Sequence, residues 1–294
     1  MISLIVPTFN RVTELDTLLT SLDRQSFRDF EAIVVDQNPD DRLMPLLGKH
    51  QGLTIHHLRS KPGVSRARNL GLRVAKGDLI AIPDDDCWYP DQLLSTVNEW
   101  FQEHSDCDVL FTSMRTEDNK RMAPKWAPGP CRCTKDNIWY CAGSITAFLR
   151  APVVEAVGFF NENIGPGTTS RYQSGEDIDY LIRPLEHGFQ MWHEPSMTVY
   201  HRELNSLERL CRTAYPYALG VGYILRIHGY SWWYMSKIVL RSLGGAALSF
   251  CKADVPRTRI YFLRALGQFQ GYIFGPGDIA RQAKSSIRSM ADTA

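Results

Sequence analysis

The chain has 294 residues, 44% of them hydrophobic and 22% charged, a composition that excludes a disordered or fibrous protein. The net charge of +1 conceals an asymmetry, because residues 201–294 hold 13 basic and 5 acidic residues whereas residues 1–200 hold 20 basic and 27 acidic ones. The acidic part has no basic stripe, which argues against nucleic acid as a partner. The basic, aromatic C-terminal part suggests contact with an anionic surface.

The first hundred residues alternate between strand and helix patterns. Apolar runs predict strands at residues 2–7, 30–36, 53–58 and 78–82, and amphipathic patterns predict helices after residue 10, at 63–75 and at 91–104. This alternation predicts an α/β fold with a mostly parallel sheet flanked by helices. Parallel sheets bind ligands beyond the carboxyl ends of their strands, so we expect residues 7–10, 36–38 and 84–86 to converge there.

The pattern changes after residue 109. Residues 115–137 contain three prolines and many charges and predict a long surface loop, while residues 165–175 have glycine at both ends and predict a hinged lid. The remaining patterns predict a strand at 142–149, a helix from 176 to about 187, and a β-rich run at 191–200. Pro184 should bend this helix or end its regular hydrogen bonding early.

The seven cysteines form neither a Cys-x-x-Cys pair nor the spacing of a disulfide framework. Cys131 and Cys133 have no second ligand pair nearby, so plain thiols are favoured over a zinc site. The first residues read as a strand and not as a signal peptide. We therefore expect the protein to stay in the reducing cytoplasm.

Asp84, Asp85 and Asp86 form the sharpest chemical signal in the sequence. Three consecutive carboxylates repel one another, so the arrangement costs stability unless a cation is bound there. Carboxylate oxygens suit Mg²⁺ or Mn²⁺, which complete their coordination shells with water and phosphate oxygens. The alternative is a solvated turn that caps the following helix, but the adjacent Trp88 and Tyr89 favour a binding site.

Five segments of the sequence resemble, in order and spacing, those of glycosyltransferase family 2, whose members have the GT-A fold. They lie within roughly residues 1–201 and read Ser3-Leu-Ile-Val-Pro-Thr-Phe-Asn-Arg11, Val34-Val-Asp36, Gly63-Val-Ser-Arg-Ala-Arg-Asn-Leu-Gly71, Lys76-Gly-Asp-Leu-Ile-Ala-Ile-Pro-Asp-Asp-Asp86 and Gly175-Glu-Asp-Ile-Asp-Tyr180. Each segment alone is weak evidence for the family, but the five segments in series are specific to it. The resemblance implies an inverting glycosyltransferase that binds Mn²⁺ or Mg²⁺ and a nucleotide-diphosphate sugar, with UDP expected ahead of dTDP or GDP.

The resemblance also implies roles for single residues. Asp36 would read the nucleotide base, Asp84 and Asp86 would hold the metal and the diphosphate, and Asp177 would be the catalytic base. The wider sets comprise Pro7, Thr8, Asn10, Arg11, Arg68, Asn69 and Asp85 on the donor side, and Trp88, Glu176 and Asp179 on the acceptor side. Two departures from the family pattern stand out: residues 37–39 read Gln-Asn-Pro in place of a second acid and a turn, and Pro83 replaces an acid before the triplet.

In some members with an aspartate triplet, a histidine about two dozen residues after the base completes the metal shell. His201 follows Asp177 by 24 residues and is expected as this ligand, with His193 as the second choice. Each local pattern also has a plainer interpretation: His201 as a packed histidine, Glu176 and Asp177 as helix caps, and Arg66 and Arg68 as solvated helix residues instead of cations near the diphosphate.

Residues 230–250 form an aromatic, apolar segment that Lys237 and Arg241 make unsuitable for spanning a membrane. On a helical wheel these two cations share a face with Gly245 and Lys252, and the opposite face carries Trp232, Met235, Val239, Leu243, Ala246 and Phe250. This pattern fits a helix lying on anionic lipid at the inner face of the cell membrane. The alternative is a helical subdomain that packs on the catalytic domain or on a second subunit of a homodimer.

We therefore expect a GT-A catalytic domain at residues 1–204 and a helical C-terminal region at 205–294. The acceptor would be a saccharide or a lipid-linked saccharide in cell-surface polysaccharide synthesis. A catalytically silent scaffold subunit of a polysaccharide-synthesis complex is the alternative, against which the set Asp84, Asp86, Asp177 and His201 argues. A nucleotidyltransferase would need a glycine-rich, basic phosphate loop near the N-terminus, which the sequence lacks.

Overall fold

The computed structural model describes residues 1–120, 126–202 and 206–291, with side chains described as far as residue 275. The chain divides into two compact units, Met1–Phe160 with Tyr180–Glu203 and Asn161–Asp179 with Leu204–Ala294. The domain boundary predicted between residues 204 and 205 lies outside the described residues and stays a prediction. Residues 161–179, which we expected in the first domain, group with the C-terminal helices.

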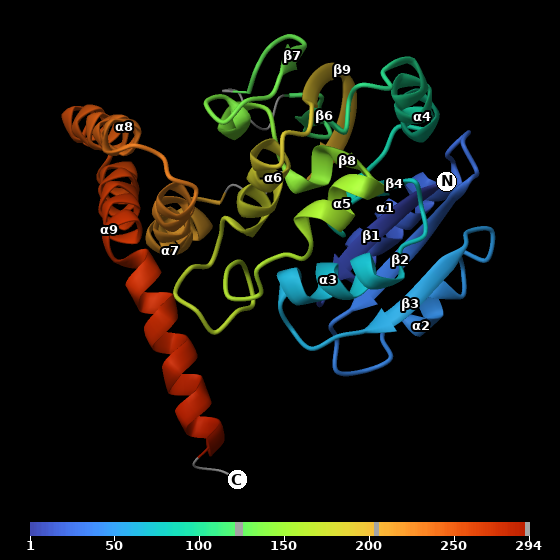
Figure 1. Ribbon diagram of the computed structural model, residues 1–294, viewed down its shortest axis with the longest axis horizontal. Coiled ribbons are helices and arrows are strands. Elements are labelled where there is room, and N and C mark those ends of the chain that lie inside the picture. The colour runs from blue at the N-terminus through green and yellow to red at the C-terminus, as the bar shows by residue number, and fades with distance from the viewer. Residues whose placement is uncertain (121–125, 203–205, 292–294) are drawn as a thin grey trace. The chain divides into compact units, whose positions relative to one another are not determined.

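The first unit is built on a nine-stranded sheet in the order β3-β2-β1-β4-β8-β6-β9-β5, with β7 paired to β9 (Figure 1). Its strands are β1 (Ile2–Thr8), β2 (Phe30–Asp36), β3 (Ile55–Arg59), β4 (Leu79–Ala81), β5 (Cys87–Trp88), β6 (Val109–Arg115), β7 (Cys131–Arg132), β8 (Ala147–Arg150) and β9 (Met191–His201). The first four strands are parallel to one another. Beyond β4 the sheet is mixed, since β8 is antiparallel to both of its neighbours and β9 is parallel to β6 but antiparallel to β5.

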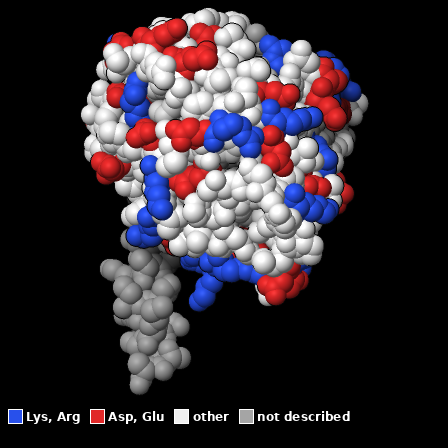
Figure 2. Space-filling model, turned by 90° about the vertical axis from the view of Figure 1, so that its right-hand side faces the viewer, with Lys and Arg blue, Asp and Glu red and all other residues white. Residues whose placement is uncertain are grey.

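The helices of this unit are α1 (Val12–Asp23), α2 (Met44–Leu47), α3 (Val64–Val74), α4 (Leu93–Glu103), α5 (Ala151–Val157) and, from Tyr180 onward, α6 (Glu176–Glu186). Strands β1 and β2 are buried along their whole length, as expected for near-continuous apolar runs covered on both faces. Helix α3 approaches β1 so closely that a Cβ atom on Gly71 would lie 2.4 Å from Ile5 Cγ2. On the face drawn in Figure 2, basic and acidic side chains are interspersed.

The predicted elements of the first hundred residues agree with these bounds to within about three residues at either end. Three features further along were not predicted: β6, β7 and α5. The expected strand at 142–149 is wrong in its first half, where a short 3₁₀ helix (η2, Ser144–Thr146) precedes β8. A second such helix (η1, Ile138–Tyr140) lies at the end of the predicted loop, and residues 131–132 of that loop form β7.

The second unit contains α7 (Leu207–Ile227), α8 (Trp232–Cys251) and α9 (Val255–Ala291), coloured orange to red in Figure 1. Glycines allow α7 and α9 to pack with their backbones in close approach. A Cβ atom on Gly222 would lie 2.1 Å from the Gln268 carbonyl oxygen, and one on Gly271 would lie 2.1 Å from the Leu219 carbonyl oxygen. No described helix combines the length and the hydropathy needed to cross a bilayer.

Helix α8 packs through its smaller residues and turns its larger ones outward. Its buried residues are Met235, Ser242, Ala246 and Ser249, whereas Trp232, Trp233, Leu240, Leu243, Leu248 and Phe250 are exposed. Of the apolar stripe identified in the sequence, Met235 and Ala246 are therefore buried, whereas Trp232, Leu243 and Phe250 are exposed. The side chains of Met235 and Ala246 lie about 60–140° around the helix from Leu243 and Leu240, on the side that packs within the unit.

Candidate functional site

The carboxyl ends of β1, β2 and β4 bring the three predicted segments together. The Gln37 backbone N–H donates to the Thr8 carbonyl at 3.0 Å, and the Asn10 N–H donates to Asn38 Oδ1 at 2.8 Å. Asn10 has a φ of 57°, a left-handed conformation that asparagine tolerates better than most residues. The turn after β1 thus lies beside the turn after β2, with Pro7 and Thr8 at the end of a buried strand.

Asp36 is fully buried at the end of β2 and is surrounded by hydrogen-bond donors. Its carboxylate lies 3.0 Å from His57 Nε2 and 3.1 Å from an Arg59 guanidinium nitrogen, and it accepts from the Asn38 side chain at 2.7 Å. Sequence reasoning missed His57 and Arg59, because their proximity depends on the β2–β3 register, which pairs Asp36 with Arg59.

The three carboxylates of the triplet each face a basic group. Arg11 Nη1 lies 2.8 Å from Asp85 Oδ1 and 2.6 Å from Asp86 Oδ2. On the other side, Arg68 donates to Asp84 Oδ1 at 3.0 Å and to Ser144 Oγ at 3.2 Å. Arg66, by contrast, is exposed and donates to the Pro62 carbonyl at 3.2 Å.

The triplet combines burial with counter-charges, and the pKa values of its members move in different directions. Burial raises the pKa of Asp85 to about 6, although the positive charge of Arg11 acts against this shift. Burial also opposes the ionisation of Asp86, but His201 and Arg11 outweigh it, so the pKa of Asp86 is lowered. Two adjacent acids therefore differ in their protonation behaviour.

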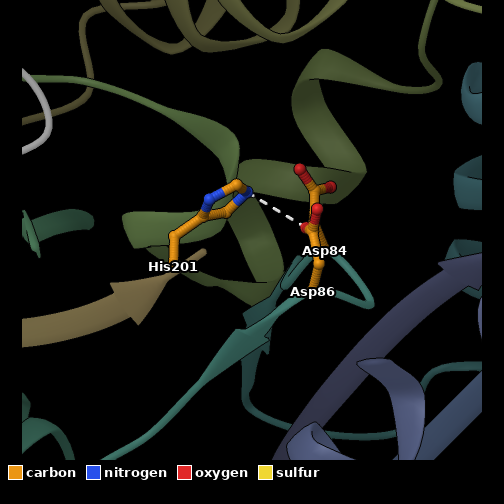
Figure 3. Close-up of side chains that lie close together, drawn as sticks. All are labelled: Asp84, Asp86 and His201. Atoms are coloured by element: carbon orange, nitrogen blue, oxygen red, sulfur yellow. Dashed lines mark ion pairs between the residues drawn. The ribbon is translucent and has the colours of Figure 1, made fainter. Parts of the chain in front are cut away.

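The short strand β5 starts directly after the triplet, and its pairing with β9 brings His201 close to the triplet. Cys87 pairs with His201 across the β5–β9 ladder, and His201 Nε2 lies 3.0 Å from Asp86 Oδ1 (Figure 3). The ligand atoms of Asp84, Asp86 and His201 all lie within 4.8 Å of one another. Such a cluster of two carboxylates and one imidazole is a suitable donor set for a divalent cation.

The orientation of the His201 ring supports this fit. Its Nδ1–H donates to the Arg202 carbonyl at 2.6 Å, so the neutral ring presents the Nε2 lone pair to Asp86. A lone pair facing a carboxylate oxygen at 3.0 Å needs a cation between them, either a proton or a metal ion. Burial disfavours the imidazolium ion, yet the carboxylates outweigh it and the pKa of His201 is raised.

Three further predicted residues have other surroundings. His193 is fully buried on β9 with Nε2 3.3 Å from the Ala127 carbonyl, and it is not part of the Asp84, Asp86 and His201 cluster. Asn69 forms a reciprocal pair with the backbone of Phe160, donating to its carbonyl at 3.0 Å and accepting from its N–H at 2.7 Å. Trp88 is half-buried and stacks on Tyr200 with ring centroids 5.8 Å apart. The donor role of Asn69 and the acceptor role of Trp88 stay predictions.

Glu176, Asp177 and Asp179 form the first turn of α6 and belong to the second unit. Asp179 is 2% exposed and its Oδ1 lies 3.0 Å from His228 Nε2 on the same unit. Asp177 Oδ1 accepts from the Ile178 backbone N–H at 2.8 Å. Acids at the start of a helix are favourable in any protein, so this placement alone does not decide between a capping and a catalytic role.

A sequence model of one family, described as glycosyl transferase family 2, matches residues 3–155 of this chain. The chain belongs to glycosyltransferase family 2. The matched segment includes β1, the turn after β2, helix α3 and the whole aspartate triplet. The family expected from the sequence motifs is therefore confirmed.

The chain is similar to an uncharacterized glycosyltransferase of Haemophilus influenzae, with 37% identity over 214 residues that make up 68% of this chain and 65% of that protein. It is also similar to poly(ribitol-phosphate) β-N-acetylglucosaminyltransferase TarS of Staphylococcus aureus, with 30% identity over 38% of this chain and 21% of TarS. The chain thus spans less than two thirds of the length of these relatives.

Two solved structures have a similar fold. The S. aureus TarS fragment 1–349 in complex with UDP-GlcNAc has a TM-score of 0.60 at 16% identity, covering 89% of this chain and 90% of the fragment. A mannosyltransferase from Pyrobaculum calidifontis in complex with GDP-Man and Mn²⁺ has a TM-score of 0.62 at 16% identity, covering 92% and 87%. The expected GT-A fold with C-terminal helices is confirmed.

Proposed function

We propose that this family 2 chain is a Mn²⁺-dependent, inverting glycosyltransferase that uses a nucleoside-diphosphate sugar. The observation that carries the proposal is the cluster of Asp84, Asp86 and His201, with the His201 ring held so that Nε2 faces the carboxylates. An imidazole nitrogen beside two carboxylates suits Mn²⁺ better than Mg²⁺, which prefers oxygen ligands. The bound ion would neutralise the diphosphate of the donor.

Arg11 and Arg68 support the same assignment, because they already balance negative charge at this position. A diphosphate bound beside the triplet would add further negative charge, which these guanidinium groups can offset by charge-assisted hydrogen bonds. Asp36, with His57 and Arg59 beside its carboxylate, would read the nucleobase of the donor. UDP is the donor nucleotide we propose to test first, since TarS was solved with UDP-GlcNAc.

Asp177 is our proposed general base. Its carboxylate would take the proton from the acceptor hydroxyl as that oxygen attacks C1 of the donor sugar from the face opposite the diphosphate. A new C1–O bond forms while the bond from C1 to the diphosphate oxygen breaks, and the electron pair leaves with the diphosphate. Attack from the opposite face inverts the configuration at C1.

The metal assignment is tested by titrating UDP into the protein calorimetrically, with Mn²⁺ and then with EDTA. We expect tight binding only with the metal, and a large loss of affinity in Asp86→Asn and His201→Ala. Trp126→Phe, a change of one aromatic ring for another at a position remote from the triplet in sequence, serves as the control. Equal UDP affinity in Mn²⁺ and in EDTA would refute the metal site.

The base is tested by comparing Asp177→Asn with Asp84→Asn. The first amide keeps the shape of the side chain but cannot accept a proton at neutral pH, so turnover should fall by about 10²–10⁴-fold while UDP affinity is retained. The second should weaken UDP binding itself. Near-normal turnover of Asp177→Asn would transfer the role of base to Glu176 or Asp179.

For the acceptor we propose a saccharide or lipid-linked saccharide of a cell-surface polymer. Two relatives are named for polymers, the poly(ribitol-phosphate) β-N-acetylglucosaminyltransferase TarS and the chondroitin synthase of Pasteurella multocida. A screen of nucleotide sugars with Mn²⁺, scored by release of nucleoside diphosphate, tests the activity before the acceptor is known. Release from one donor above the background of Asp84→Asn supports an enzyme. No release from any donor would instead favour the silent scaffold subunit.

We further propose that α8 and the first half of α9 bind an anionic membrane surface. Along α9 the exposed side chains Val255, Phe262, Leu266, Phe269 and Ile273 recur at helical spacing and form one apolar stripe. Helix α8 presents a second stripe, in which Trp233 is 71% and Phe250 74% exposed. Exposed apolar stripes of this size on a soluble domain mark an interaction surface.

The charges of this segment favour lipid over a second copy of the chain. Residues 231–275 contain six basic residues and one acid, Asp254. In a twofold-symmetric dimer the same patch would face itself, so like charges would be brought together. An anionic bilayer instead attracts each of these cations while the aromatic side chains enter the interface.

Sedimentation with phosphatidylcholine vesicles, with and without phosphatidylglycerol, tests this proposal. We expect binding only to the anionic vesicles, with weaker binding as salt is added and after the double change Lys237→Glu, Arg241→Glu. Arg24→Glu with Lys49→Glu, two exposed cations of the first unit, is the charge-matched control. A stable dimer by light scattering, without vesicle binding at low salt, would assign the surface to a second subunit.

A further inference from the structure

Cys131, Cys133 and Cys141 lie together in the first unit of the structure, although Cys141 is distant from the other two in the sequence. Cys131 lies on β7, and two residues later the Cys133 backbone N–H donates to the Met191 carbonyl on β9 at 2.8 Å. Cys141 follows the 3₁₀ helix η1 and returns to the same place. The Sγ atoms of Cys133 and Cys141 are 3.3 Å apart, and Cys131 also contacts Cys141.

The turn between Cys133 and Cys141 is held by its own hydrogen bonds. Asn137 donates from its side chain to the Arg132 carbonyl at 3.0 Å and accepts from the Thr134 N–H at 2.7 Å. Its backbone carbonyl lies 3.2 Å from Cys141 Sγ. The two thiols are therefore held at a separation that a small side-chain rotation converts to the bond length of about 2.05 Å in a disulfide.

The three thiols differ in accessibility and in chemical character. Cys133 and Cys141 are buried, whereas Cys131 is half-buried and is the member that solvent reaches. The hydrogen bond between the Cys133 and Cys141 thiols lowers the pKa of Cys141 despite its burial, which favours the nucleophilic thiolate. Where no such hydrogen bond outweighs it, burial raises the pKa of the thiol, as it does for Cys131 and, to about 12, for Cys107.

We propose that Cys131, Cys133 and Cys141 form a redox-modifiable site, in which Cys131 receives a small disulfide such as oxidised glutathione and a Cys133–Cys141 disulfide is the product. The Cys131 thiolate attacks the oxidant, forming a mixed disulfide and releasing one reduced glutathione. The Cys141 thiolate then attacks Cys131 Sγ and releases the second glutathione. Finally Cys133 attacks Cys141 Sγ, forms the buried disulfide and returns Cys131 to the thiol.

The balance of this sequence is two cysteine thiols oxidised to one disulfide and one glutathione disulfide reduced to two thiols. The disulfide would form close to the aspartate triplet along the chain. Only two residues separate Cys141 from Ser144, whose hydroxyl accepts a hydrogen bond from Arg68, and Arg68 also donates to Asp84. The disulfide would restrain the segment that leads into this contact. The proposal is independent of the metal and of the transfer reaction.

The experiment uses the full-length protein, reduced, desalted, incubated with oxidised glutathione and then blocked with N-ethylmaleimide. Trypsin places the three cysteines on separate peptides, residues 126–132, 133–135 and 136–150. Digestion without reduction should therefore yield peptide 133–135 linked to 136–150, and dithiothreitol should abolish the linked species. Cys251 is exposed on the second unit, and its mixed disulfide with glutathione reports that the oxidant was active.

Variants test the order of events. Cys131→Ser should form the same linked peptides at least ~10-fold more slowly, since direct attack on a buried thiol is then required. Cys133→Ser should shift the link to peptides 126–132 and 136–150, because Cys141 then keeps its bond to Cys131. Recovery of 133–135 and 136–150 as maleimide adducts in the wild type, while Cys251 is glutathionylated, would overturn the proposal.

Discussion

Asn69 lends itself to a quantitative test, because the structure gives its side chain a defined pair of partners. Both Asn69 and Phe160 are less than 5% exposed, and the asparagine amide satisfies the N–H and the carbonyl of Phe160 at once. In Asn69→Ala both backbone groups lose these hydrogen bonds inside the protein. Each buried, unsatisfied group costs about 1–3 kcal/mol, so with two such groups the first unit should lose about 2–6 kcal/mol of stability.

A domain of this size loses roughly 2–4 °C of Tm per kcal/mol, which predicts a fall of about 4–24 °C in the Tm of thermal unfolding. Asn98→Ala, a half-buried asparagine within α4, is the matched control and should change Tm by less than about 2 °C. Equal effects of the two variants would refute the assignment of Asn69 as a clamp on Phe160.

Asn69→Asp sharpens the test through its pH dependence. The carboxylate can still accept from the Phe160 N–H but repels the Phe160 carbonyl, whereas the protonated acid can donate to that carbonyl as the amide does. The folded-state pKa of this aspartic acid should therefore lie above its unfolded value. Its contribution to stability is present below the unfolded pKa and is lost as pH rises through the folded pKa, so the Tm deficit relative to wild type should shrink between pH 7 and pH 5. A deficit independent of pH would contradict this reasoning.

Two further predictions concern the first unit. Gly71→Ala should lower stability by about 1–3 kcal/mol, because its Cβ would lie 2.4 Å from Ile5 Cγ2, whereas Gly129→Ala, with no atom within 4 Å of the added methyl group, should be nearly neutral in the same denaturation assay. Arg11→Gln should leave Asp85 and Asp86 with less counter-charge, so Mn²⁺ should raise the Tm of this variant by more than it raises that of the wild type. An equal metal-induced rise in both proteins would show that Arg11 does not compensate the triplet.

The parts of the fold that sequence reasoning predicted are those specified by local pattern. Residues 30–36 form an uninterrupted buried run ended by Asp36, and β2 has these same bounds. Strand β6 was missed because Thr112, Ser113 and Arg115 interrupt its apolar run. Strand β6 is stabilised by its pairing with β9, a ladder that shifts register between Thr112 and Ser113. Because β9 is distant in the sequence, no local pattern reveals this pairing.

The same distinction holds for the candidate site. The triplet and His201 could be predicted because family motifs mark both, and the structure brings Asp84, Asp86 and His201 together. The partners His57 and Arg59 of Asp36 could not, because a neighbouring strand supplies them. Cys141 escaped notice for a similar reason, since only the turn between residues 133 and 141 returns it to Cys133.

The pairing of Cys87 with His201 joins two positions more than a hundred residues apart in the chain. The register of strands β5 and β9 sets the separation of Asp86 and His201, so the length of the intervening polypeptide does not affect this separation. Segments between these strands, such as the one around Gly129, can therefore gain or lose residues without moving the two side chains. Within this architecture the segments between the two strands are free to diverge while the separation of Asp86 and His201 stays constant.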